Sequence, residues 1–202
     1  MTQIALFHSV LGVRPGIHYA AARLRDAGHD VLVVDQYDGR SFDDYEEADA
    51  FTQAIGFPAL MDRALDAVEP LADGFVAMGF SNGAGMAEFV ATERRVGGVV
   101  LVSGTLPLAM LGVEAWPAGV PAQVHATLGD SMRRQEWHDA LTASIRAAGA
   151  PLEVFDYEGH GHLFTDASLP DEFDAEATAA LFGGVVAFAP LAMSRRAGAS
   201  LD

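Results

Sequence analysis

The sequence predicts an α/β protein in which a mostly parallel sheet of six strands carries helices on both of its faces. Short apolar runs alternate with amphipathic segments along the chain, which is typical of strand–helix–strand units. The crossovers of such units are right-handed and make the sheet parallel. Polar residues suited to chemistry directly follow several predicted strands, as expected when ligands bind at the carboxyl ends of parallel strands. The 202 residues are expected to form one domain, 1–202.

The first predicted elements are two strands with a helix between them. The apolar run 4–7 is expected to be a strand covered on both faces. A turn-rich loop over 8–16 follows, and Pro15 suits the first position of a helix that is ended by Gly28. The second strand is expected over 31–34.

A longer insertion, 35–73, separates the second strand from the third. Its first part, 38–50, is strongly acidic, with Phe42 and Tyr45 among the acidic residues. Its second half carries apolar residues at helical spacing, which predicts a core-facing helix: Leu60, Met61, Ala64, Leu65 and Val68. Whether 35–50 closes over a site is left open by the sequence.

The rest of the chain continues the alternation. Further strands are expected at 75–80, 99–103, 122–128 and 152–157. Helices are expected at 82–94, 132–148 and 171–188. The turn-rich segment 104–119 lies where a strand ends, so it is a candidate for part of a substrate pocket. The last residues, 195–202, are expected to be frayed.

The composition excludes several classes of protein. The formal net charge of −16 disfavours nucleic acid and anionic membranes as partners, and solubility is the simpler explanation of the acidity. The absence of cysteine excludes disulfides, thiolate metal sites and a cysteine nucleophile. All twelve basic residues are arginine, so a Schiff-base lysine and the lysine of a P-loop are excluded too.

The sequence predicts neither a secretion signal nor a membrane span. Residues 1–5 lead straight into a strand without a preceding basic region, unlike a signal peptide. The stretch 181–193 is short for a membrane span and contains Gly183, Gly184 and Pro190, so a core-packing helix is the better interpretation. We therefore expect a cytoplasmic protein, either a monomer or a homodimer.

The segment Gly79-Phe80-Ser81-Asn82-Gly83 has the pattern G-x-S-x-G and joins an apolar strand to a helix. In a nucleophile elbow of this kind the serine occupies a strained turn, and its oxygen projects above the sheet. The glycines have a steric reason, because side chains there would collide with the neighbouring strand and helix. The pattern alone is weak, and Ser81 could instead cap the following helix.

Two downstream residues strengthen the interpretation of Ser81 as a nucleophile. Asp130 and His162 follow it in the order serine, acid, histidine that accompanies this elbow. A serine hydroxyl needs a base to take its proton, which is the role we expect for His162, while Asp130 would orient the imidazole ring. Asp130 could also be a turn residue, in which case Asp156 or Asp166 would be the alternative acid.

The other histidines allow competing interpretations. His160 is the alternative to His162 as the base. These two could share a metal with His8 or His125, but no carboxylate-rich ligand set accompanies them, so no metal site is predicted. His8 and His125 are instead expected to satisfy backbone groups near strand ends.

Some aromatic and basic residues have no assigned role. Four aromatic side chains could line an apolar pocket or belong to the core: Phe42, Tyr45, Trp116 and Phe164. Three arginines are expected to be solvated charges: Arg40, Arg133 and Arg134.

Five segments carry a resemblance to a known family: Ser9-Val10-Leu11-Gly12-Val13, Asp35-Gln36-Tyr37, Gly79-Phe80-Ser81-Asn82-Gly83, His125 to Asp130, and Tyr157-Glu158-Gly159-His160-Gly161-His162-Leu163-Phe164. With them, almost the whole chain resembles the dienelactone hydrolase family of the α/β-hydrolase superfamily. The last segment is similar to the family pattern Y-x-G-x-G-H-x-F, which places the catalytic histidine at His162. The resemblance implies a minimal α/β-hydrolase fold that works without a cofactor.

The sequence departs from that family at three positions. Dienelactone hydrolase proper has a cysteine where this chain has Ser81, and the carboxylate of its first loop is replaced by Ser9. Its arginine for the substrate carboxylate lies four residues after the histidine, where this chain has Asp166. We expect this inversion of charge to argue against an anionic dienelactone substrate.

The resemblance also implies an oxyanion hole made of backbone N–H groups. One donor would be Asn82, after the nucleophile, and the other Val10 in the first loop, with Leu11 as the alternative. We therefore expect a serine hydrolase that cleaves a small, neutral or weakly polar carboxylic ester or lactone through an acyl-enzyme on Ser81. The alternatives are a same-triad enzyme acting on C–C or amide bonds, and an inactive binding protein of the same fold.

Overall fold

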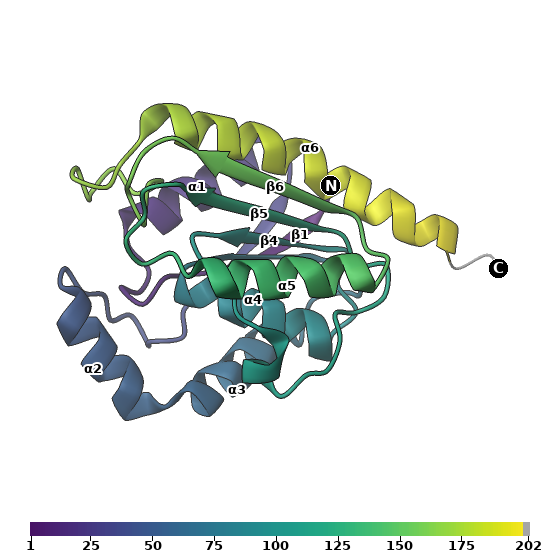
Figure 1. Cartoon of the computed structure of the whole chain (residues 1–202), viewed down its shortest axis with the longest axis horizontal. Helices are drawn as coiled ribbons and strands as arrows, with labels where there is room; N and C mark the ends of the chain where they lie inside the picture. The colour runs from purple at the N-terminus through teal and green to yellow at the C-terminus, as the bar shows by residue number, and fades with distance from the viewer. Residues whose placement is uncertain (200–202) are drawn as a thin grey trace.

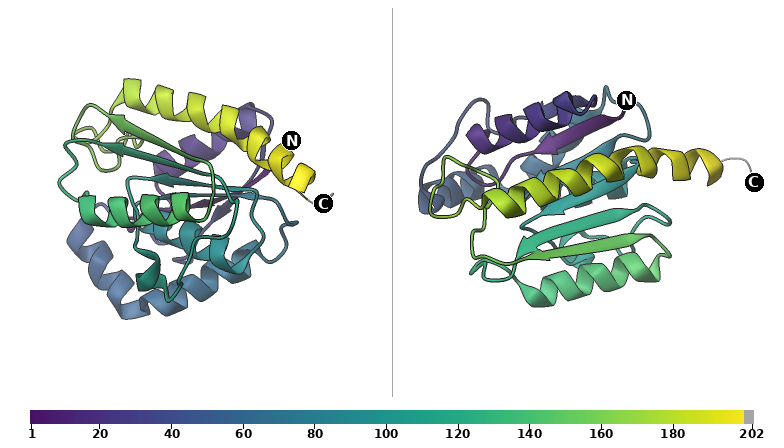
Figure 2. Two further views of the ribbon diagram at one scale, coloured as in Figure 1. Left: turned by 45° about the vertical axis from the view of Figure 1, so that its right-hand side comes forward. Right: turned by 90° about the horizontal axis from the view of Figure 1, so that it is seen from above.

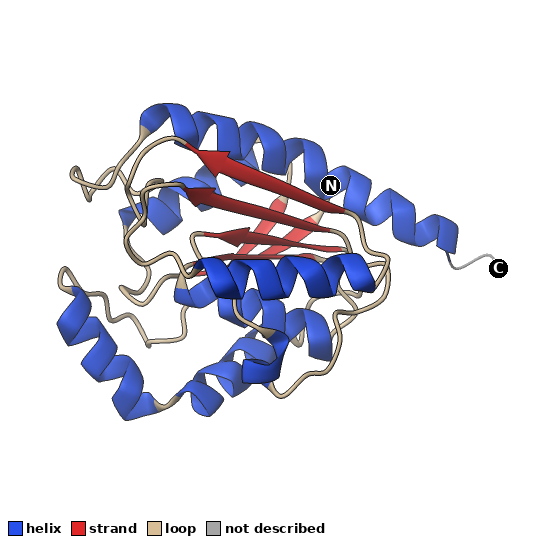
Figure 3. Ribbon diagram, viewed as in Figure 1, coloured by secondary structure: helices blue, strands red, loops and turns tan. Residues whose placement is uncertain are grey.

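The computed structural model describes residues 1–199, and the side chains of residues 1–188. At its centre is one six-stranded sheet with the order β2-β1-β3-β4-β5-β6, in which every neighbouring pair is parallel (Figure 3). The strands are β1 (Gln3–Phe7), β2 (Asp30–Val34), β3 (Val76–Phe80), β4 (Gly98–Val102), β5 (Ala122–Thr127) and β6 (Leu152–Tyr157). The predicted α/β fold is confirmed, with a sheet that is parallel throughout.

Helices cover both faces of the sheet, as the sequence predicts. They are α1 (Pro15–Asp26), α2 (Tyr45–Ile55), α3 (Phe57–Val68), α4 (Asn82–Glu93), α5 (Gln135–Ala147) and α6 (Ala175–Ala199), with a 3-10 turn at Leu108–Leu111. Helices α1 and α6 pack on one face, and α3, α4 and α5 pack on the other (Figures 1 and 2). The sheet is thus the middle layer of three.

The central strands β1, β3 and β4 are apolar almost throughout because both of their faces are buried, whereas the edge strand β6 is partly exposed and carries Glu153 and Asp156. In β1, Ile4 and Leu6 belong to the cluster under α1 and α6, whereas Ala5 and Phe7 belong to the cluster under α3 and α4. Alternate side chains of a strand point to opposite faces, so a doubly covered strand needs apolar residues at every position. This is why the short apolar runs predict the strands well.

The acidic part of the insertion contains a helix that was not predicted from the sequence. Helix α2 begins after Asp44, whose carboxylate accepts a hydrogen bond from the Glu47 N–H at 2.8 Å. Only Ala48 is buried among its residues. Tyr45, Ala48, Phe51 and Ile55 nevertheless recur at helical spacing, and Phe51 and Ile55 pack against the core, so this helix could have been predicted from its apolar pattern. The core-facing helix predicted for the second half of the insertion corresponds to α3.

The last helix differs from its prediction at both ends. It starts at Ala175 rather than 171, and it continues to Ala199, so 195–199 are helical and not frayed. The rest of the expected frayed tail, 200–202, lies outside the described residues. Within the part of the chain that the structure describes, no helix is long and apolar enough to cross a membrane.

Candidate active site

The turn between β3 and α4 holds Ser81 in a strained backbone conformation. Ser81 has φ 53° and ψ −114°, one of three positive φ values found for non-glycine residues in the described chain. A Cβ on Gly79 would lie 1.9 Å from the Gly83 carbonyl oxygen, and one on Gly83 would lie 2.4 Å from the His8 carbonyl oxygen. Only glycine therefore allows the strand, turn and helix to approach so closely, as expected for a nucleophile elbow.

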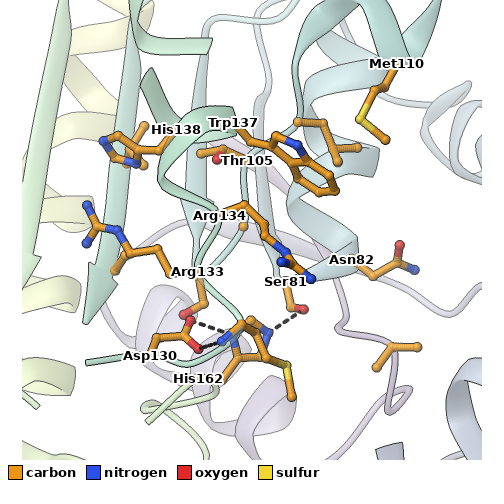
Figure 4. A pocket seen from close by; sticks show the side chains of 18 of the residues that line it. Ser81, Asn82, Thr105, Met110, Asp130, Arg133, Arg134, Trp137, His138 and His162 are labelled. Carbon is orange, nitrogen blue, oxygen red and sulfur yellow. Dashed lines mark hydrogen bonds and ion pairs between the residues drawn. The ribbon is translucent and has the colours of Figure 1, made fainter. Parts of the chain in front are cut away.

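Ser81, His162 and Asp130 form a continuous hydrogen-bonded chain (Figure 4). The Ser81 Oγ lies 2.7 Å from Nε2 of His162, and Nδ1 of the same ring lies 2.7 Å from Asp130 Oδ2. Because a carboxylate only accepts, Nδ1 carries the proton and Nε2 is free to accept from the serine. The structure thus brings together all three residues that the sequence singled out.

Neighbouring groups fix the acid and the base in place. Asp130 Oδ1 accepts a hydrogen bond from the Met132 N–H at 2.8 Å, which holds the carboxylate in a tight turn after β5. On the other side, Thr127 Oγ1 donates to the Gly161 carbonyl at 2.8 Å, next to His162. The Leu163 N–H donates to Glu172 at 2.6 Å. The histidine is therefore held from both flanking residues.

The alternative acids and the alternative base lie elsewhere. Asp156 pairs with Arg133 at 2.6 Å, and Asp166 pairs with Arg14 at 3.4 Å. Neither contacts His162. His160 is exposed, and Ser81 makes no side-chain capping bond to α4. Of the combinations of serine, acid and histidine that the sequence allows, only Ser81, Asp130 and His162 are joined by hydrogen bonds.

The expected oxyanion donors belong to two separate segments of the chain. The loop after β1 and the start of α4 place Val10 and Asn82 in the wall of the same cavity as Ser81. Within the described residues, neither of their N–H groups has an acceptor in the protein. The Leu11 N–H, by contrast, donates to Ser9 Oγ at 3.2 Å. This occupied donor favours Val10 over Leu11.

Ser81, Asp130 and His162 all line a cavity of about 540 Å³. A volume of this size lies within the usual range of ligand pockets. The turn-rich segment after β4 supplies one wall, as predicted, and the acidic segment and α2 supply another. The side chains and backbone that line it include Tyr45, Asp49, Thr52, Phe57, Gly104, Thr105, Leu106, Met110, Val124, Ala126, Met132, Arg133, Arg134, Trp137 and His138.

The structure decides between the alternatives left open for four aromatic residues and corrects one other expectation. Of the four, only Tyr45 lines the cavity, whereas Phe42, Trp116 and Phe164 pack in the core. Arg133 is not a solvated charge, because its side chain is 12% exposed and paired. Trp137 and His138 of α5 also line the cavity and were not predicted to do so. Their position shortly after Asp130 and the end of β5 could have indicated this.

The two buried histidines outside the triad have different partners. His8 fulfils its predicted role, because it binds the Ser9 carbonyl at 2.7 Å and accepts from the Gln36 N–H at 3.1 Å. His125 does not, since its partners are the side chains of Tyr157 and Gln123. Burial lowers the pKa of His125 to about 3, so the ring is neutral. In the part of the chain described, no three histidine or carboxylate side chains are grouped as a metal site would require.

Asp166, which stands where dienelactone hydrolase proper has an arginine, is turned away from the cavity. Its carboxylate binds Arg14 and both the N–H and the hydroxyl of Ser168. Gly16 leaves room for it, because a Cβ there would lie 2.6 Å from the Asp166 side chain. The charge of Asp166 is therefore matched inside the protein. The expectation that it opposes an anionic substrate loses its basis.

Comparisons with known proteins agree with the fold. The model of the dienelactone hydrolase family matches residues 2–189. A dienelactone hydrolase-like promiscuous phosphotriesterase from metagenomic libraries is 24% identical, with a TM-score of 0.76 over 94% of this chain and 86% of that one.

A dienelactone hydrolase homologue from Klebsiella pneumoniae is 16% identical, with a TM-score of 0.73 over 94% and 87% of the two chains. A carboxylesterase from Bacillus cereus is 17% identical, with a TM-score of 0.54 over 95% and 89%. These structures share the α/β-hydrolase fold with this chain. The comparison with curated proteins finds no match.

Proposed function

Because the chain belongs to the dienelactone hydrolase family, which makes it a hydrolase, we propose that it cleaves a small carboxylic ester or lactone through an acyl-enzyme on Ser81. The observation that carries the proposal is the chain of two 2.7 Å hydrogen bonds from Ser81 through His162 to Asp130, at the wall of an open cavity. A serine nucleophile, a base and an orienting acid in this order suit acyl transfer.

In the first half-reaction, Ser81 Oγ attacks the ester carbonyl carbon while Nε2 of His162 takes the hydroxyl proton. Asp130 stabilises the imidazolium that forms. In this proposal the N–H groups of Val10 and Asn82 donate to the oxyanion of the tetrahedral intermediate. When the intermediate collapses, the bond from the carbonyl carbon to the alkoxy oxygen breaks, and the imidazolium protonates the leaving oxygen. This leaves the acyl group on Ser81.

In the second half-reaction, a water molecule attacks the acyl-enzyme and gives a proton to Nε2 of His162. The second tetrahedral intermediate collapses with Ser81 Oγ as the leaving group, and the imidazolium returns the proton to it. The acid is released and the enzyme is regenerated. A lactone follows the same course, except that its leaving hydroxyl stays attached to the acyl product.

The test is hydrolysis of a panel of short-chain p-nitrophenyl esters by the wild type and by Ser81→Ala. We expect activity in the wild type and a loss of at least about 10³-fold in kcat/KM for the variant, as for a triad nucleophile. The matched control is Ser144→Ala on α5, whose hydroxyl binds only the Ala140 carbonyl. This control should retain activity.

A second measurement covers a wild type that cleaves none of these esters. A fluorophosphonate probe that labels wild type and Ser144→Ala but not Ser81→Ala would show an activated serine with a different substrate, such as an amide or a C–C bond. No labelling of Ser81 at all would contradict the proposal and favour a binding protein that has lost its chemistry.

A further inference from the structure

Two consecutive arginines at the cavity are in opposite situations. Arg133 is bound on both sides, to Asp156 at 2.6 Å and to Gln135 at 3.0 Å. Arg134 is exposed, and its guanidinium has no hydrogen bond or ion pair with the residues described. Figure 4 shows the Arg134 side chain extending toward Ser81 and His162, while that of Arg133 points away from them.

The remaining charges around the cavity leave Arg134 unmatched. Asp130 is paired with His162, and Asp49 of α2, which also lines the cavity, forms no ion pair in the described structure. Burial and the nearby Arg133 lower the pKa of His138, so this ring is neutral at pH 7. Among the cavity-lining residues that the structure describes, Arg134 is the one cation whose donors are free.

An unpaired arginine that lines the cavity needs an explanation in so acidic a protein. The chain has 28 acidic residues against 12 basic ones, so carboxylates are plentiful. Six arginines with described side chains hydrogen-bond to or form ion pairs with other protein groups: Arg14, Arg25, Arg63, Arg94, Arg95 and Arg133. Arg23, Arg40 and Arg146 have no such partner among the described residues, but unlike Arg134 they do not line the cavity. The free donors of Arg134 face the space that a substrate would occupy. A planar guanidinium in such a place suits a carboxylate, which it can bind through two parallel hydrogen bonds.

We propose that Arg134 is a specificity-determining residue that binds a carboxylate of the substrate, so that the preferred ester is an acidic one. This inference rests on the proposed ester hydrolysis at Ser81. The site differs from the position of the arginine in dienelactone hydrolase proper, because Asp166 holds that position and is closed off by Arg14. Arg134 instead approaches the cavity from the start of α5.

The test uses two pairs of esters that differ only in charge. Mono-p-nitrophenyl adipate and its methyl ester place the carboxylate on the acyl side. 4-Acetoxybenzoate and its methyl ester place it on the leaving group. We expect the wild type to prefer the acid of at least one pair by about tenfold in kcat/KM, in line with a charge-assisted hydrogen bond. The preferred pair reveals which half of the ester lies beside Arg134.

The variants separate a specific contact from a general effect of charge. Arg134→Gln should abolish the preference, mainly by raising KM for the acid, and should leave the neutral methyl esters within about threefold of wild type. Arg134→Lys should restore part of the preference. Arg146→Gln, at the exposed far end of the same helix, makes the same change in net charge and should keep the preference. Added salt should weaken the preference of the wild type.

Two results would overturn the inference while leaving the proposed function intact. One is Ser81-dependent cleavage with no preference for the acid in either pair. The other is a preference that persists in Arg134→Gln. If instead no ester is cleaved and Ser81 is not labelled by a fluorophosphonate, the proposed hydrolysis fails first and the inference fails with it.

Discussion

Two buried polar clusters near the carboxyl ends of the strands join distant parts of the chain, and they differ in what they leave unsatisfied. Around Arg14, the guanidinium donates to the Phe42 carbonyl, to Asp43, to Asp166 and to Ser168. None of these residues lines the cavity. The hydrogen-bond donors of the Arg14 guanidinium are thus used by protein groups away from the cavity, and the cluster offers no site for a ligand there.

The cluster around Ser81 also combines a serine hydroxyl, a carboxylate and a nitrogen base, here the imidazole of His162, but one of its members is open to the cavity. Its carboxylate and imidazole are as buried as the side chains of Arg14 and Asp166. The serine hydroxyl, however, faces the cavity, and its backbone is held in a strained turn. A saturated cluster can only stabilise the fold, whereas an incompletely saturated one that faces a cavity can act on a substrate. The comparison therefore predicts losses of activity in one cluster and losses of stability in the other.

The largest expected effect is that of Asp130→Asn. The amide would present N–H groups to Nδ1 of His162, so the ring would shift to the tautomer protonated at Nε2 and could no longer accept from Ser81. We expect kcat/KM to fall by about 10³- to 10⁴-fold, while the midpoint of chemical denaturation changes little. The measurement is ester hydrolysis beside a urea titration followed by circular dichroism.

The control for that variant is Asp156→Asn, which changes the other candidate acid. Asp156 contacts Arg133 and not His162, so its variant should lose at most about tenfold. Equal losses in the two variants would mean that Asp130 has no special part in the reaction. Such a result would remove the distinction between an open and a closed cluster.

The second expected effect is on stability and concerns Arg14→Met. Removal of the guanidinium leaves Asp166, whose side chain is 6% exposed, without its counter-charge. Breaking a buried ion pair in this way costs about 3–5 kcal/mol of the free energy of unfolding. We expect a large fall in the urea midpoint but an unchanged kcat per folded molecule, since no member of the cluster touches the cavity.

Asp43→Asn is the matched control for the Arg14 variant. Asp43 pairs with the same guanidinium, but its side chain is 97% exposed, so the change should cost no more than about 1 kcal/mol. If Asp43→Asn destabilised the protein as much as Arg14→Met, burial would not be what makes the cluster structural. If Arg14→Met lost kcat per folded molecule, the cluster would belong to the active site after all.

The two clusters also show what the sequence could and could not predict. Ser81, Asp130 and His162 each follow the carboxyl end of a predicted strand, and parallel strands gather their carboxyl ends at one edge. Their meeting could therefore be predicted from local patterns. The partnership of Arg14 with Asp166 could not, because it joins residues 152 positions apart through two irregular loops.

The cavity wall was predicted only in part. The turn-rich segment after β4 was expected there, but α2 was missed because its apolar residues, such as Phe51 and Ile55, are only partly buried and stand among acidic and polar residues. The opposite directions of Arg133 and Arg134 depend on how the chain enters α5. Composition and spacing carry no information about such a choice.

The smallest expected effect concerns Glu88 in α4. Its carboxyl is incompletely satisfied, like the cluster around Ser81, but it does not line the cavity, like the cluster around Arg14. One oxygen accepts from the Leu106 N–H at 2.9 Å, and the other is buried without a partner among the described residues. Burial raises the pKa of Glu88 well above its ordinary value. The folded protein thus keeps a proton that the unfolded chain releases above the ordinary glutamate pKa of about 4.3. As the pH rises from there toward the raised pKa, stability falls.

Glu88→Gln should remove this pH dependence, because the amide keeps an acceptor for Leu106 but cannot ionise. We expect its free energy of unfolding, relative to wild type, to increase steadily from acidic to mildly alkaline pH, by about 1 kcal/mol or more. Urea titrations over that range measure the difference, with Glu93→Gln at the exposed end of the same helix as the control. A constant difference would show that the orphan oxygen is paired and that Glu88 belongs with the saturated cluster. A rising difference places it between the two clusters, as a buried polar group that is incompletely satisfied but faces no cavity and so only costs stability.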